Sequence, residues 1–335
     1  MKGGPWAGAL NLIKPPGMSS HDVVAVVRRL LGQRQVGHGG TLDPGAAGVL
    51  PVFVGPATRL VPFLPPQWKR YRAEMVLGVR TDTGDSWGRT EEIRTEFSIP
   101  PARLGEVLAG MVGEQLQRPP VVSAVHHQGR RLYELHREGL APEPLPRRVV
   151  IDEVHIVRII PDDPYELTFG TRILLDISCS PGTYIRSFCA DAGERLGCGA
   201  HLSFLVRTAS GPYRLEEAHT LQELEAAVAA GELEKLLISP AEMTKHLPAF
   251  RVADAGVLRR LQNGNAVALD GVPREEPAAS DSRLAGDQAR LARVLDEHGR
   301  LICIVRPDQA SGGSRQERWR PVRVLVPPGG GANGS

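Results

Sequence analysis

The residues best suited to chemistry lie in a glycine-rich segment near the start of the chain. Residues 37–55 read GHGGTLDPGAAGVLPVFVG and place an imidazole, a hydroxyl and a carboxylate close together, at His38, Thr41 and Asp43. Glycine lets the backbone take positive φ or pass close to another chain. The apolar run 49–54 that follows has the length of a strand. We therefore expect a loop fixed to a strand, holding a carboxylate at a cleft that a large substrate can enter.

Asp43 also has an ordinary local explanation. Asp-Pro-Gly is a common turn sequence, in which the aspartate accepts backbone hydrogen bonds and the proline presets φ. The whole of residues 37–51, however, resembles the catalytic motif of the TruB family of tRNA pseudouridine synthases. That resemblance implies that Asp43 is the catalytic carboxylate. It also implies that His38 fills the space left when the target uridine leaves its stack.

A second likeness to this family lies in GTYIR, residues 182–186, which we expect at a strand-to-helix turn. An arginine that opens a helix is usually a surface residue. An arginine delivered by such a turn can instead pair with an acid and favour its ionised form. The resemblance implies that Arg186 pairs with Asp43 and that Tyr184 lines the same pocket.

Three more residues are assigned with help from the resemblance. On local pattern Tyr71 is a half-buried strand tyrosine and Leu205 is a core leucine. The family carries a tyrosine in this Lys-x-Tyr context against the target base and a leucine beneath the base, which implies both roles here. Lys14, beside a Pro-Pro-Gly turn, is expected to be solvated, or to support the active loop and contact RNA.

The densest local basic patch lies in residues 126–137. Residues 117–133 resemble a further family signature, Pro-x-x-Ser-Ala-x-Lys-x-x-Gly-x-Arg-x-Tyr, with His127 in place of the usual lysine. A charge run of this kind is either a solvated face or a clamp for RNA phosphates. We expect Arg130, Arg131 and Arg137 to bind RNA, and a phosphate contact at His127 to be weaker or pH-dependent.

The apolar patterns indicate the elements that must hold these residues. They predict strands at 10–13, 49–54, 68–78, 149–151, 154–157 and 173–179, and helices at 20–31, 101–114, 185–196 and 220–238. With the resemblance, this implies an α+β protein of the pseudouridine synthase fold. Its central sheet is expected to be mixed, largely antiparallel and flanked by helices.

The pattern of expected helices and strands changes near residue 247. A helix at 252–263, paired strands at 290–295 and 301–305, and a strand at 319–325 resemble a small PUA-like β domain. We expect a catalytic domain at 1–246 with an RNA-binding insertion at 117–145, a PUA-like RNA-binding domain at 247–326, and a disordered tail at 327–335. The polar segment 272–288 has no assigned role.

Net charge, cysteine content and apolar runs limit the classes of protein to which this sequence could belong. The net charge of +2 over 335 residues gives no global signal for nucleic acid, so an RNA-binding face must come from local clustering. The four cysteines form no Cys-x-x-Cys pair, so buried free thiols of a reducing compartment are expected rather than disulfides or zinc. No apolar run is long enough to span a membrane, and no secretion leader is evident.

The motifs together predict an enzyme that isomerises uridine to pseudouridine in tRNA, at position 55 of the T loop. We expect no cofactor and no metal, because the reaction needs neither ATP nor redox chemistry and the chain has no phosphate-loop or dinucleotide motif. The expected partner is the T arm of tRNA, and the protein is expected to be a cytoplasmic monomer. The long 117–145 segment and the lack of a lysine-rich tail favour a stand-alone enzyme over a guide-RNA-dependent one.

Two alternatives from other classes remain. A non-catalytic tRNA-binding or folding protein on the same scaffold would keep a basic face but could dispense with Asp43 and Arg186. An N-glycosylase-type hydrolase would use water where the uracil returns, and would release free uracil.

Overall fold

The computed structural model describes residues 6–65, 68–120, 126–127, 130–131, 144–161, 163, 165–277, 290–308 and 317–325. Within 126–131 only the backbone is described, as two short paired strands, β8 (His126–His127) and β9 (Arg130–Arg131). The predicted RNA contact Arg137, the predicted tail 327–335 and most of the segment 272–288 lie outside the described residues.

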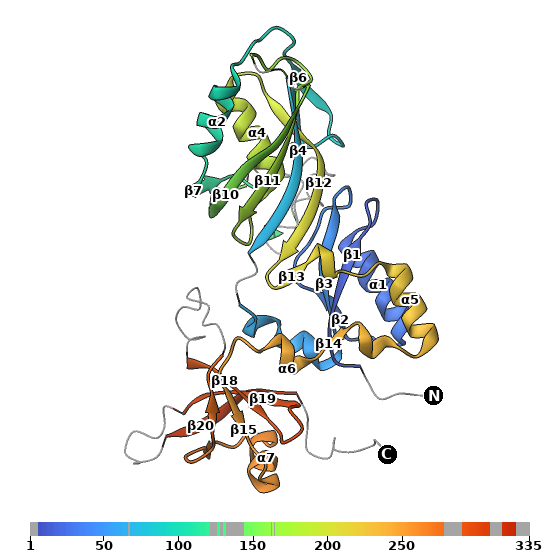
Figure 1. The fold of residues 1–335 in the computed structure, drawn as a ribbon, viewed down its shortest axis with the longest axis vertical. Coiled ribbons are helices and arrows are strands. Elements are labelled where there is room, and N and C mark those ends of the chain that lie inside the picture. Colours follow the sequence, from blue (N-terminus) through green and yellow to red (C-terminus); the bar gives the residue numbers. More distant parts are fainter. Residues whose placement is uncertain are drawn as a thin grey trace.

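The first sheet forms the upper two-thirds of the molecule in Figure 1. Its strand order is β14 (Leu237–Ile238), β1 (Gly8–Lys14), β3 (Ala47–Val54), β12 (Ala200–Ser210), β4 (Lys69–Leu77), β11 (Arg172–Cys179), β10 (Arg147–Ile160) and β7 (Gly113–Gln117), with β2 (Val36–His38) beside β3 and β13 (Tyr213–Arg214) beside β12. Within this sheet β3 and β12 pair in parallel, and the other described pairs are antiparallel. The predicted fold class, a mixed and largely antiparallel sheet, is confirmed.

Helices flank this sheet in two groups (Figure 1). They are α1 (Ser20–Leu31), α2 (Pro101–Ala109), α4 (Ile185–Leu196), α5 (Leu221–Ala230) and the short α6 (Pro240–Met243), with 3₁₀ turns at Gly55–Phe63, Leu215–Glu217 and Leu233–Lys235. Helices α1 and α5 bury apolar side chains such as Val23, Val27 and Leu224 with residues of β1 and β3. Helices α2 and α4 do the same beside β4 and β11, through Leu104 and Phe188.

Local signals fix α1 particularly well. The Ser19 hydroxyl accepts from the Asp22 backbone N–H, and the Asp22 carboxylate accepts from the Ser19 N–H at 2.8 Å, which completes a capping box. Gly32 ends the helix in the left-handed conformation, at φ 60°. This places the loop after α1, and with it the glycine-rich segment, at a defined position beside β1.

Four predicted elements differ clearly from those in the structure. Helix α2 ends at Ala109, because Gly110 closes it and residues from Gly113 enter β7. Helix α5 ends at Ala230 with Gly231 as its cap, and the rest of the predicted helix 220–238 includes the edge strand β14. The two predicted strands near 149–157 are one strand, β10, continued through irregularities in its pairing with β11.

The second sheet begins at Ala249, close to the predicted boundary at 246/247. Its order is β16 (Val267–Ala268), β20 (Arg318–Val324), β19 (Leu301–Pro307), β18 (Ala292–Leu295), β15 (Ala249–Arg251) and β17 (Arg274–Glu275), with α7 (Ala255–Gln262) alongside. One apolar cluster joins the two sheets, because Leu60, Leu64 and Met243 of the first part pack with Leu291 and Ile304 of the second. The two parts therefore share buried surface.

A hairpin outside both sheets carries a loop that matters below. Strands β5 (Val79–Thr81) and β6 (Thr90–Ile93) pair with each other, and residues 82–89 connect them. The Ser86 N–H donates to the Leu202 carbonyl at 3.0 Å, and the Leu202 N–H donates to the Gly84 carbonyl at 3.0 Å. The loop is thus bound to β12. No helix in the described part of the chain is long and apolar enough to cross a membrane.

Candidate active site

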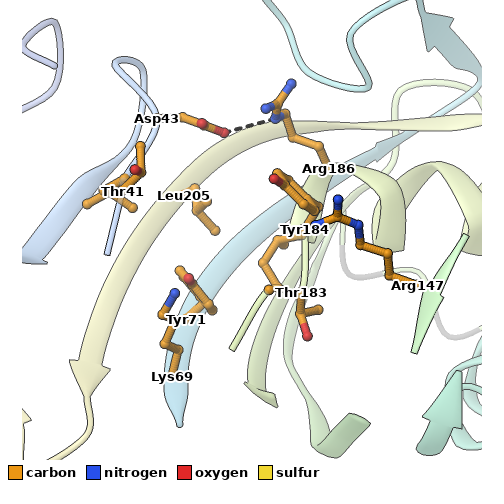
Figure 2. A pocket seen from close by; sticks show the side chains of 12 residues that line it. Thr41, Asp43, Lys69, Tyr71, Arg147, Thr183, Tyr184, Arg186 and Leu205 are labelled. Carbon is orange, nitrogen blue, oxygen red and sulfur yellow. Dashed lines mark ion pairs between the residues drawn. The ribbon is translucent and has the colours of Figure 1, made fainter. Parts of the chain in front are cut away.

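A cavity of about 540 Å³ opens where the glycine-rich loop meets β4, β12 and the turn before α4. Its lining consists of Thr41, Leu42, Asp43, Lys69, Tyr71, Arg147, Gly182, Thr183, Tyr184, Ile185, Arg186 and Leu205. Figure 2 shows Asp43 and Arg186 facing each other, with Leu205 beside them, Tyr71 and Lys69 on one side and Tyr184 and Arg147 on the other. Five residues that the sequence predicts to act together, Asp43, Tyr71, Tyr184, Arg186 and Leu205, all line this cavity.

The centre of the site is an ion pair between Asp43 and Arg186. The Arg186 Nε lies 2.9 Å from the Asp43 Oδ2, and the arginine side chain is 5% exposed while the aspartate is 41% exposed. The Asp85 Oδ2 lies 3.6 Å from the same Nε, and the Arg186 Nη1 donates to the Thr83 carbonyl at 3.1 Å. A buried guanidinium therefore orients a carboxylate that still reaches solvent and substrate.

Two buried cations hold the loop that carries Asp43. The Arg207 guanidinium donates to the carbonyls of Val49 at 2.7 Å and of Gly40 and Thr41 at 3.2 Å each. The Lys14 ammonium donates to the Pro44 carbonyl at 3.2 Å, and also to two carbonyls of the turn after β1. These bonds span both sides of Asp43, so they fix the backbone from which its carboxylate projects.

A glycine allows this close packing. At Gly48 φ is 108°, and a Cβ placed there would lie 2.3 Å from the backbone oxygen of Arg207. A side chain at this position would push β3 and β12 apart at their parallel contact. On the other side of the loop, the Ser20 hydroxyl at the start of α1 bonds both the N–H and the carbonyl of Leu42.

The turn before α4 delivers Arg186. The backbone N–H of Tyr184 donates to the Gln117 Oε1 at 2.8 Å, and the Gln117 amide nitrogen donates back to the Tyr184 carbonyl at 3.0 Å. The Thr183 hydroxyl donates to the Ser180 carbonyl at 2.9 Å, which tightens the turn. The predicted strand-to-helix delivery of Arg186 is confirmed, and Gln117, on β7, is the side chain that locks it.

The floor of the cavity has unusual electrostatics. Tyr71 is buried, and burial raises the pKa of its hydroxyl to about 12, against a smaller opposing effect of the Arg207 charge. Burial lowers the pKa of Lys69 to about 8, and repulsion from Arg207 adds to that effect. Near neutral pH, Tyr71 is therefore a neutral phenol and Lys69 a poorly hydrated cation close to its titration point.

The position of Lys14 differs from the prediction. The sequence predicts a solvated lysine or an RNA contact, but its side chain is fully buried and its three hydrogen bonds go to carbonyls. Burial lowers its pKa to about 8, against an opposing effect of the Asp43 charge. A side chain with no exposed surface cannot contact RNA in this conformation. Of the predicted roles, the structure shows support of the active loop.

His38 lies on β2, outside the lining of the cavity. Its ring stands edge-on to that of His21, with the ring centres 6.0 Å apart, and its Nδ1 accepts from the Gly40 N–H at 3.3 Å. Its role in replacing a flipped uridine stays a prediction. The same holds for RNA binding by Arg130 and Arg131, whose side chains are outside the description. All four cysteines are buried free thiols, as predicted.

Sequence reasoning missed three side chains at the site. The predicted site contains no residue of the loop 82–89, but Asp85 of this loop faces Arg186. Asp82 acts as a cap, since it accepts from the Arg89 N–H at 2.8 Å. Arg207 and Lys69 were also missed. A charged residue at an inward position of an apolar strand is the signal that could have revealed them.

Comparisons with known proteins agree with this geometry. Residues 28–185 match the model of the TruB family pseudouridylate synthase N-terminal domain, and residues 186–244 match that of the tRNA pseudouridylate synthase B C-terminal domain. The chain belongs to the TruB family. It is therefore an enzyme of the pseudouridylate synthase class, and the cavity around Asp43 is its candidate active site. The second sheet lies beyond both matched regions.

Relatives extend the likeness over most of the chain. The tRNA pseudouridine synthase B of Moorella thermoacetica is 45% identical over 310 residues, which cover 92% of this chain and 96% of that protein. The tRNA pseudouridine synthase B of Pelotomaculum thermopropionicum is 40% identical over 322 residues, covering 95% and 97%.

The fold has solved counterparts. A chain of the archaeal box H/ACA sRNP Nop10–Cbf5 complex superposes with a TM-score of 0.66 at 25% identity, covering 96% of this chain and 86% of that one. A chain of an H/ACA RNP bound to a substrate RNA containing 2′-deoxyuridine gives a TM-score of 0.67 at 26% identity, covering 96% and 85%.

Proposed function

We propose that this protein isomerises uridine to pseudouridine in tRNA, at position 55 of the T loop, as a stand-alone cytoplasmic enzyme. The observation that carries the proposal is the Asp43 carboxylate, held by a buried arginine at the edge of a cavity with an aromatic and an apolar wall. The relatives named tRNA pseudouridine synthase B, which match over nearly the whole chain, support tRNA as the substrate.

The reaction breaks the C1′–N1 bond of uridine, turns the uracil, and forms a C1′–C5 bond. A proton leaves C5 and N1 takes one up, so atoms and electrons balance without a co-substrate. Asp43 acts at C1′ as nucleophile or at C2′ as base, which are roles of carboxylates in glycosyl chemistry. Arg186 supports the anion, and its nearly complete burial keeps water from weakening that support.

The remaining wall residues hold the base while it turns. Leu205 offers an apolar surface to the detached uracil, and Tyr71 lies against its face. Because the pKa of Tyr71 is about 12, its hydroxyl serves as a hydrogen-bond donor, and it gives up a proton only when that loss is coupled to another transfer. Tyr184 closes the far side, and Lys69 and the exposed Arg147 favour the negatively charged backbone.

The C-terminal sheet and the segment 117–145 supply binding rather than chemistry. None of the residues lining the active cavity comes from the second sheet, among those described. We assign residues 247–326 to a PUA-like RNA-binding domain that contacts phosphates and sugars away from the target base. Arg130, Arg131 and Arg137 contact the backbone of the T arm, and the protein acts as a monomer without a guide RNA.

The test is incubation of the purified protein with unmodified tRNA transcript and no other component, followed by pseudouridine mapping and assay for free uracil. We expect pseudouridine at position 55, no free uracil, and no product from a transcript with cytidine at that position. Free uracil would instead identify a hydrolase. Product formed only after a guide RNA is added would overturn the stand-alone proposal, and binding without product would favour a non-catalytic role.

A second experiment addresses the basic segment. The double variant Arg130→Ala, Arg131→Ala should flatten the log–log salt dependence of tRNA binding by roughly one to two phosphate equivalents. An unchanged slope would remove this segment from the RNA interface.

A further inference from the structure

A second cavity, of about 460 Å³, adjoins the active cavity. Asp43, Arg186 and Leu205 line both, and they form the boundary between the two. Beyond this boundary the lining of the second cavity includes Gly45, Thr83, Asp85, Trp87, Leu202 and Phe204. The reaction as proposed uses none of its aromatic side chains.

Two aromatic rings at this cavity lie open to solvent. Trp87 is 80% exposed and Phe204 is 49% exposed. The indole of Trp87 lies against the backbone of the active loop, since a Cβ placed at Gly45 would be 2.4 Å from its Nε1. Single exposed apolar residues need no explanation, but two large aromatics that line one cavity indicate a binding surface.

The loop that presents Trp87 is built to hold it. The Asp85 Oδ1 accepts from the Trp87 N–H at 3.0 Å and from the Thr83 hydroxyl at 2.7 Å. The hydrogen bonds between this loop and Leu202 tie it to the strand that carries Phe204. Both rings are thus attached to one hydrogen-bonded unit, formed by the loop 82–89 and β12. The second carboxyl oxygen of Asp85 contacts Arg186 and so connects this unit to the active cavity.

The charges at the cavity exclude some occupants. The carboxylates of Asp43 and Asp85 line it, so an RNA phosphate would meet repulsion there. Among the described residues that line it, the one cation is Arg186, which is already engaged by both carboxylates. A flat, uncharged ring with apolar faces fits these surroundings, and every nucleobase has such a face.

We propose that this cavity is a second base-binding subsite, which holds the base of a nucleotide flanking the target uridine by stacking on Trp87 and Phe204. The proposal rests on the proposed function. When the target uridine occupies the active cavity, its neighbour is one phosphodiester away, and the second cavity begins at the same three residues. The subsite would hold the RNA strand in the unstacked conformation that the reaction needs.

The experiment uses the full chain and a T-arm stem-loop in three forms, which are intact, abasic at the 5′ neighbour of the target, and abasic at the 3′ neighbour. Loss of a base–aromatic stack corresponds to about tenfold in affinity. We expect Trp87→Ala to raise KM by about that factor on intact RNA and Trp87→Phe to restore most of the loss. On the RNA that lacks the stacked base, the effect of Trp87→Ala should disappear.

A matched control is Tyr165→Ala, which removes an aromatic side chain that is 83% exposed and lines neither cavity. Its KM should stay at the wild-type value. If Trp87→Ala has no effect on intact RNA, or an equal effect on both abasic forms, the subsite is wrong. Wild-type protein that forms no pseudouridine in tRNA would contradict the proposed function instead, so the two failures are distinguishable.

Discussion

Removal of the guanidinium of Arg207 should lower both the stability of the protein and kcat, because this side chain holds the backbone of the active loop. Arg207 is fully buried, and it donates three hydrogen bonds, at 2.7, 3.2 and 3.2 Å, to the carbonyls of Val49, Thr41 and Gly40. In the variant Arg207→Met these acceptors lose a charged donor, and the carbonyl of Val49 loses it in a buried position. The loop would relax to find other donors and would carry Asp43 with it.

The size of the effect can be worked from these bonds. A hydrogen bond to a charged group contributes about 1.5–3 kcal/mol, so three would give at most about 9 kcal/mol. The variant also no longer buries a cation, which offsets part of that loss. We expect a net destabilisation of about 3–5 kcal/mol. A shift of Asp43 by about 1 Å would in addition lower kcat by roughly a hundredfold.

The assay combines urea unfolding with the rate of pseudouridine formation, measured at a temperature at which the variant is folded. A matched control is Arg214→Met, which removes an exposed arginine from the neighbouring strand β13 and should change neither quantity. If the free energy of unfolding of Arg207→Met were lower than that of wild type by less than about 1 kcal/mol, and pseudouridine formed at the wild-type rate, the view that this cation organises the loop would be refuted.

Three further predictions follow from the same geometry. Asp85→Asn keeps the oxygen that accepts from the Trp87 N–H but removes the second carboxylate beside Arg186. The single-turnover rate constant should fall about tenfold while the Kd for tRNA stays unchanged. An unchanged rate constant would exclude a role of Asp85 in catalysis. Lys69 has a pKa lowered to about 8 from 10.5 by burial, so between these values the folded protein binds fewer protons than the unfolded chain and stability rises with pH. The stability of wild type relative to Lys69→Met, from urea titrations, should thus increase from pH 8 to 10, and a constant difference would contradict the burial argument. A chain ending at Pro248 should still fold and act on a T-arm stem-loop. Its Tm should be lower by roughly 10 °C, because the apolar cluster around Leu60 and Met243 no longer packs against the second sheet. An unchanged Tm would show that the cluster is complete without the second sheet.

Local signals in the sequence predict the elements well where they act over a few residues. The capping box of Ser19 and Asp22 and the glycine at position 32 delimit α1, and the apolar run before Gly55 gives β3. These contacts are short in sequence, so one chain is enough to recognise them. The pairing of Asp43 with Arg186 joins distant segments, and only the resemblance to the TruB family predicted it.

Other features depend on tertiary contacts that no local pattern records. A lone lysine or arginine reads as exposed, because the loss of its hydration is costly. Lys14 and Arg207 are buried only because the folded chain turns several carbonyls toward each. Likewise, Leu237 and Ile238 follow a helical pattern, but they pair with β1 because Gly231 has ended the helix and an open sheet edge lies beside them.

The most direct test of the central claim is replacement of Asp43 by asparagine. The change keeps the size of the side chain and removes its negative charge. Asp176→Asn is a matched control, because Asp176 is also 41% exposed and ion-paired to an arginine, at 2.7 Å, but does not line the active cavity. The measurement is pseudouridine at position 55 of tRNA together with the Kd for tRNA. We expect Asp43→Asn to form no pseudouridine while its Kd changes by less than about tenfold, or ~1.4 kcal/mol, and Asp176→Asn to behave as wild type. Turnover retained by Asp43→Asn would contradict the account.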